Sequence, residues 1–137
     1  MKIFLDTDVI LDFLGDRKPF SKHAATIFSL AYRKQLQLFT SSNSITSTYY
    51  LLSKIAGEKQ SRQLVMELLK YMSVVPVTEK ILIEALNSLF RDFEDGVQHF
   101  SALSHPELKV IVTRNLRDYS KSTLDIKSPE EFLLNIQ

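Results

Sequence analysis

Acidic side chains gather in three separate segments of this chain, and each segment flanks an apolar run. These positions, together with one asparagine, are Asp6, Asp8, Asp12, Asp92, Glu94, Asp95, Asn115 and Asp118. Carboxylates that converge without basic partners repel one another, and a bound divalent cation is the usual relief. The pattern therefore indicates a metal-dependent hydrolase as the first hypothesis, provided that the fold brings the segments together.

The secondary structure expected around these segments would bring the three acidic segments close together. Strand-like runs lie at residues 2–5, 36–40, 73–77 and 108–113. They alternate with segments of helical periodicity, which predicts a three-layer α/β domain with a mainly parallel central sheet. Sites in such sheets form beyond the carboxyl ends of the strands. Because Asp6 ends the first run and Asn115 follows the last, we expect these two strands to be neighbours and the two side chains to lie close together.

Each acid also has a purely structural interpretation. Asp6 would cap the helix expected to follow it, and Asp8 would suit the positive end of that helix dipole. Asp12 would lie on a solvated helix face. If the acids were only caps on an unrelated scaffold, Asp6, Asp95 and Asp118 would lie far apart.

Composition narrows the class of protein. With 137 residues and 45% hydrophobic content, we expect a single domain over residues 1–137. The formal charge of +1 gives no global attraction to polyanions, so an RNA partner would be bound by local patches. No apolar run approaches the ~20 residues that span a bilayer, and the first strand leaves no room for a signal peptide. We therefore expect a cytoplasmic protein with no membrane association.

Three motifs, LDTDVILDFL, DFEDGVQHFSAL and VIVTRNLRDY, together resemble the PIN-domain family. The likeness runs in the family's order over essentially the whole chain, including the terminal SPEEFL, and is greatest to the small single-domain bacterial proteins related to VapC toxins. It implies a PIN-like three-layer fold whose acidic pocket holds Mg²⁺ or Mn²⁺ for the cleavage of single-stranded RNA. It also implies a homodimer and an antitoxin protein as partner.

The resemblance assigns roles residue by residue. The catalytic and metal-binding positions that it implies are Asp6, Asp95 and Asp118, with Asp8 as a further metal ligand. The supporting positions are Asp12, Ser47, Glu94, Thr113 and Asn115. Phosphate contacts to RNA are expected from Arg114, Arg117 and Lys121.

One departure from the family pattern matters for activity. The family usually places a glutamate where this chain has Ser47, and many members have an aspartate where it has Asn115. A hard cation prefers anionic oxygens, so both differences should reduce its affinity. Two hypotheses follow: the remaining carboxylates still support an endoribonuclease, or the domain is catalytically degenerate and acts as an RNA-binding or protein-interaction module. Restoring glutamate at position 47 would distinguish them.

Overall fold

A five-stranded parallel sheet forms the centre of the computed structural model, which describes residues 1–136. The strand order is β3-β2-β1-β4-β5. In chain order the strands are β1 (Lys2–Leu5), β2 (Gln37–Ser41), β3 (Met72–Val75), β4 (Val110–Val112) and β5 (Asp125–Lys127). Phe4 of β1 pairs with Phe39 on one side and with Ile111 on the other. The strands that carry the first and third acidic segments are therefore neighbours, as expected.

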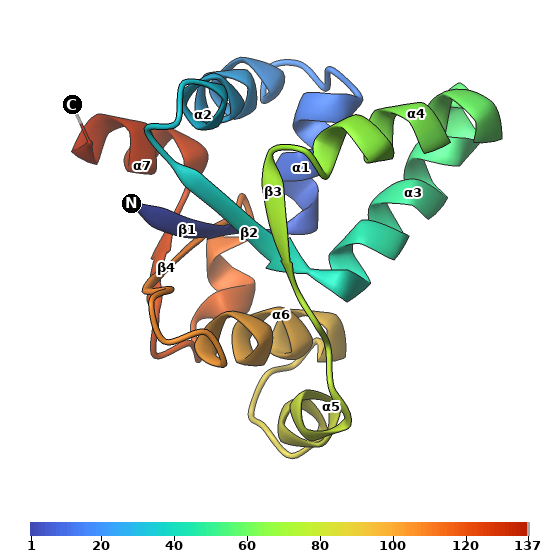
Figure 1. Cartoon of the computed structure of the whole chain (residues 1–137). Coiled ribbons are helices and arrows are strands. Elements are labelled where there is room, and N and C mark those ends of the chain that lie inside the picture. The colour runs from blue at the N-terminus through green and yellow to red at the C-terminus, as the bar shows by residue number, and fades with distance from the viewer. Residues whose placement is uncertain (137) are drawn as a thin grey trace.

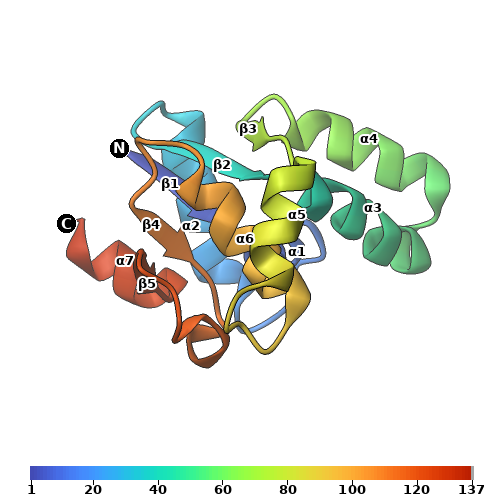
Figure 2. The same ribbon diagram turned by 90° about the horizontal axis from the view of Figure 1, so that it is seen from below.

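Helices cover both faces of this sheet and confirm the three-layer α/β prediction (Figure 1). In chain order they are α1 (Thr7–Leu14), α2 (Ser21–Tyr32), α3 (Ser42–Ala56), α4 (Glu58–Leu68), α5 (Glu79–Leu86), α6 (Phe93–Leu103), the 3₁₀ helix η1 (Leu116–Tyr119) and α7 (Pro129–Asn135). Helices α1, α2 and α7 lie on one side of the sheet, and α6 lies on the other with α5 outside it (Figures 1 and 2). Among the helices of residues 1–136, none is long and apolar enough to cross a bilayer.

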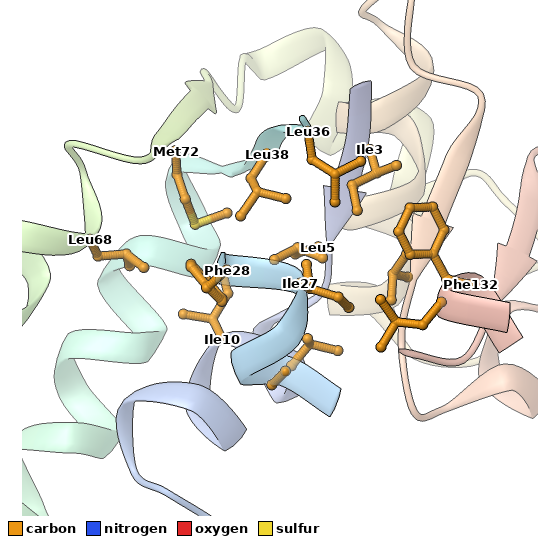
Figure 3. Packing of buried hydrophobic residues seen from close by; sticks show 14 residues of the cluster. Ile3, Leu5, Ile10, Ile27, Phe28, Leu36, Leu38, Leu68, Met72 and Phe132 are labelled. Carbon is orange, nitrogen blue, oxygen red and sulfur yellow. The ribbon is translucent and has the colours of Figure 1, made fainter. Parts of the chain in front are cut away.

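Alternate residues of the central strands pack into two hydrophobic cores, one on each face of the sheet. Ile3 and Leu5 face Ile27 of α2 and Phe132 of α7 in the larger core, which Figure 3 shows from close by. Phe4 points to the opposite face, where it packs in the second core with residues of α6 and η1. Successive side chains of a strand point to opposite faces, so a central strand buried on both sides must be apolar throughout.

The caps follow the sequence signals closely. Thr78 accepts a hydrogen bond from the backbone N–H of Ile81 and begins α5, and Ser128 forms a capping box with Glu131 at α7. Gly57 joins α3 to α4 with a φ of 80°, a conformation that favours glycine. Two elements were not expected from the sequence, the edge strand β5 and the 3₁₀ helix η1.

Candidate functional site

Asp6 follows β1 directly and links the sheet to the candidate site. Its backbone N–H donates to the carbonyl of Val112 at 3.0 Å, which extends the pairing of β1 with β4 by one residue. Its side chain caps α1 by accepting from the N–H of Thr7 at 2.8 Å. The capping role considered from the sequence is therefore real, but the same carboxylate also faces a pocket.

That pocket is a cavity of about 300 Å³ at the carboxyl ends of β1 and β4. Its lining is mostly polar. The lining residues are Asp6, Thr7, Asp8, Leu11, Arg17, Asn43, Ser47, Leu51, Glu94, Asp95, Gln98, Arg114 and Asn115. Residues of all three segments thus line one cavity, although the third segment contributes Asn115 and not its acid, Asp118. The alternative that Asp6 and Asp95 cap distant parts of the fold is wrong.

Three donors hold the buried carboxylate of Asp6. Besides the N–H of Thr7, Gln98 Nε2 donates to Oδ1 at 3.1 Å and Thr113 Oγ1 donates to Oδ2 at 2.8 Å. Thr113 is itself fully buried at the end of β4. All three donors are uncharged, so they fix the orientation of the carboxylate without forming an ion pair with it.

Asp8 lies in the first turn of α1 and faces the same cavity. Its Oδ2 accepts from the backbone N–H of Arg114 at 3.0 Å, whereas its Oδ1 is buried and has no hydrogen-bond partner among the described residues. Burial raises the pKa of this carboxyl, and the nearby charge of Asp6 raises it further. A buried carboxylate oxygen without a partner is costly, and a cation or an ordered water would relieve it.

Asp12 occupies a different environment from the one that the sequence suggested. It is 1% exposed and does not lie on a solvated face. Arg114 Nε donates to its Oδ2 at 2.6 Å, while Arg114 Nη2 and Arg17 Nε donate to its Oδ1 at 3.0 and 2.8 Å. The Arg114 guanidinium also stacks on Phe20 at 3.8 Å from the ring centroid. Asp12 is thus paired with two arginines, and Arg114, predicted to contact RNA, is held by Asp12 and Phe20.

Asp95 lies in the first turn of α6 and is half-buried at the cavity. Burial raises its pKa to about 7, and the charges of Asp6, Asp92, Asp118 and Glu94 add to this effect in that order. Mutual repulsion of this kind is expected where carboxylates converge without a cation. Asp118, predicted as the third catalytic acid, is exposed in η1 outside the set of lining side chains, although its charge reaches Asp95.

The remaining predicted residues divide between the cavity and the surface. Ser47, at the position where the family usually has glutamate, lines the cavity from α3. Asn115 lines it from the segment after β4. Arg117 and Lys121 are exposed in or just after η1, so they are accessible to a polyanion.

Several site residues were missed by sequence reasoning. Asn43, like Ser47, lies on α3 and lines the cavity four residues earlier, on the same helix face. Gln98 lies three residues after Asp95 on α6, and this helical spacing was the signal that would have found it. The hydroxyl of Tyr119 is buried without a partner among the described residues, and burial and the charge of Asp6 raise its pKa, which keeps it protonated.

The donor set fits a hydrated divalent cation better than a metal bound entirely by protein. Within residues 1–136, no group of three or more Asp, Glu, His or Cys side chains is assembled as a complete metal site. Mg²⁺ does not need one, because it usually keeps several waters and binds through one or two carboxylates. Asp6 and Asp95 offer two such carboxylates, and the unpartnered Oδ1 of Asp8 offers an acceptor for a bound water.

Sequence comparison decides the family. A model of the PIN domain matches residues 2–117, most of the chain. The chain belongs to the PIN-domain family. This PIN domain is 26% identical over 136 residues to Ribonuclease VapC1 of Aquifex aeolicus (strain VF5), and the match covers 96% of this chain and 92% of that protein. The resemblance to small VapC-like proteins noted from the three motifs is thereby confirmed.

Solved structures agree on the fold. The PIN domain is similar to a chain of DNA-bound VapBC from Salmonella typhimurium, with a TM-score of 0.70 and 19% identity, covering 94% of this chain and 98% of that one. It is also similar to a chain of a toxin–antitoxin complex from Klebsiella pneumoniae, with a TM-score of 0.65 and 17% identity, covering 93% and 97%. At these identities the likeness concerns the fold.

Proposed function

We propose that this PIN domain is a divalent-metal-dependent endoribonuclease that cleaves single-stranded RNA and serves as the toxin of a toxin–antitoxin pair. The observation that carries the proposal is the shared cavity of Asp6 and Asp95, in which burial raises the pKa of Asp95 and the nearby charge of Asp6 raises it further. The family membership and the relative named as a ribonuclease support the same activity. The likeness to a chain of a toxin–antitoxin complex supports an antitoxin partner.

The proposed cation is Mg²⁺ or Mn²⁺. Asp6 and Asp95 would hold it directly, and Asp8 would hold one of its waters. When bound, the cation supplies Lewis acidity, which promotes ionisation of the attacking water and offsets the charge that develops on the scissile phosphate. Asp118 and Glu94 add negative potential around Asp95, which favours a cation at this position.

The chain's own residues would orient the substrate. Asn43, Ser47 and Asn115 present neutral amide and hydroxyl groups to the cavity. Such groups can bond to phosphate oxygens and to the ribose 2′-hydroxyl, which distinguishes RNA from DNA. Arg117 and Lys121 would contact phosphates outside the cavity, where the strand continues over the surface.

A cleavage assay tests this function. A fluorescently labelled single-stranded RNA should be cut by the wild-type protein in Mg²⁺ and left intact in EDTA. Asp6→Asn and Asp95→Asn should each abolish cleavage while retaining the far-UV circular dichroism of the wild type. Full activity in either variant, or equal activity in EDTA, would refute the proposal.

A second candidate function rests on Ser47. The cavity has a hydroxyl where the family usually has a carboxylate, which favours a degenerate domain that binds RNA or a protein without cutting. That function predicts RNA retention in a filter-binding assay with no product in Mg²⁺ or Mn²⁺, and a gain of cleavage in Ser47→Glu.

We also expect a homodimer, which light scattering on the purified protein would test.

A further inference from the structure

A chain of hydrogen bonds runs from the end of β2 to the carboxylate of Asp6. Ser41 Oγ accepts from the N–H of Ser44 at 3.0 Å, because Ser41 caps α3. The Ser41 hydroxyl in turn donates to Gln98 Oε1. Gln98 Nε2 then donates to Asp6 Oδ1 at 3.1 Å. The path joins three elements, β2, α6 and β1, at the edge where the cavity opens.

This path fixes the direction of the Gln98 amide. The oxygen of Ser41 already accepts from a backbone N–H, so its own proton is free to go to Gln98. A hydroxyl donor requires the carbonyl end of the amide, and the NH₂ end must then face Asp6. Both Ser41 and Gln98 are buried, at 0% and 4% exposure, so bulk water does not compete for these bonds. A bond in such surroundings is directional and costly to break.

The choice of an amide has an electrostatic consequence. A lysine or arginine at position 98 would pair with Asp6 and neutralise it, as Arg114 and Arg17 neutralise Asp12. The Gln98 amide holds the carboxylate in one orientation and brings no charge of its own. Asp12 and Asp6 therefore differ through their partners: Asp12 is paired with two arginines, whereas the donors to Asp6 are uncharged.

We propose that Gln98, oriented by Ser41, is a positioning residue that aims the Asp6 carboxylate into the cavity and so sets its affinity for a divalent cation. This inference rests on the proposed function, because it assumes that Asp6 binds the cation. Residues that hydrogen-bond to metal-binding side chains typically change metal affinity about 10- to 100-fold when mutated. Gln98 would act at this level and would not touch the cation itself.

The test is Mn²⁺ binding by isothermal titration calorimetry, with folding measured separately by urea unfolding in EDTA. Gln98→Met keeps the length of the side chain and removes both bonds, so Mn²⁺ should bind about 10- to 100-fold more weakly. Ser101→Ala is the matched control, because Ser101 is buried on the same helix and its Oγ has no partner among the described residues. It should bind Mn²⁺ as the wild type does.

The outcomes separate this inference from the proposed function. If wild type binds Mn²⁺ and Gln98→Met binds it equally well, the positioning role is wrong and the proposed cation site stands. If wild type binds no Mn²⁺, both fail. Should Gln98→Met not fold, NMR on the wild type provides the second measurement. The Gln98 side-chain NH₂ resonances should shift during a Mg²⁺ titration, with the same fitted dissociation constant as the resonances of Asp6. Unchanged Gln98 resonances would overturn the proposal.

Discussion

Replacing Asp12 by asparagine is expected to lower the free energy of unfolding by about 3 kcal/mol. Asparagine keeps the shape of the side chain, but it loses the negative charge and places an NH₂ group against a guanidinium donor. Asp12 is 1% exposed and receives three charge-assisted bonds from Arg114 and Arg17. Removing one partner of a buried ion pair is costly because the other charge stays behind without compensation.

The magnitude follows from the bonds and from the exposure of the arginines. Hydrogen bonds to charged groups contribute about 1.5–3 kcal/mol each, and asparagine should lose roughly two of the three. The side chains of Arg17 and Arg114 are 40% and 27% exposed, so water can replace part of what is lost. The expected loss in the free energy of unfolding, about 3 kcal/mol, is therefore near the lower end of the roughly 3–6 kcal/mol that two such bonds contribute. For a domain of this size, about 3 kcal/mol corresponds to a decrease in Tm of roughly 10 °C.

The assay is urea unfolding followed by far-UV circular dichroism in EDTA, so that a bound cation does not contribute. Glu107→Gln is the matched control, since its carboxylate is exposed and pairs with Lys2 at the surface at 2.7 Å. Exposed pairs contribute little, so this variant should unfold nearly as the wild type does. If Asp12→Asn is no less stable than Glu107→Gln, the structural role of the buried pair is refuted. A Mn²⁺ affinity reduced as far as in Asp6→Asn would make Asp12 a metal ligand instead.

Three further predictions concern the cavity and its surroundings. The pKa of Asp95 is about 7 in the folded protein and near 3.8 when unfolded, so the metal-free protein should lose stability as pH rises from about 4 to about 7. Thermal denaturation should show this loss and a larger rise in Tm with Mg²⁺ at pH 8 than at pH 5.5. Both effects should be smaller in Asp95→Asn, in which only the raised pKa of Asp8 remains. Ser47→Glu should strengthen Mn²⁺ binding in calorimetry, and unchanged binding would indicate that position 47 lies out of reach of the cation. Arg117→Ala and Lys121→Ala should each weaken RNA binding at low salt and reduce the steepness of its salt dependence, whereas identical salt titrations would exclude them as phosphate contacts.

The fold was predictable because its central strands are unambiguous in the sequence. A strand that is buried on both faces is typically a continuous apolar run in the sequence. This pattern is present in Lys2–Leu5 and in the run ending at Val112. Strand β5 was missed because two of its three residues, Asp125 and Lys127, are charged, which is unlike a buried strand. It pairs at the edge of the sheet, where one side of the strand needs no partner.

The candidate site was predictable only for residues whose type and local position in the sequence already indicate a role. The carboxylates of Asp6 and Asp95 follow a strand and begin a helix, positions that topology brings to one edge. The environment of Asp12 depends on Arg114, which is distant in sequence. No local sequence pattern predicts an ion pair between two such distant residues. Gln98 is a neutral amide among helix residues, and its role follows from contacts with Ser41 and Asp6 that exist only after folding.

Anomalous diffraction from crystals soaked in Mn²⁺ would show whether Asp6 and Asp95 hold one divalent cation. We expect a single strong peak in the cavity, at about 2.1 Å from one oxygen of each carboxylate, the distance typical of a small octahedral cation. Asp95→Asn crystals soaked in the same way should lose the peak. A cavity without a peak in the wild type, or a peak bound by other residues with Asp6 and Asp95 not involved, would show that these two carboxylates do not form the cation site.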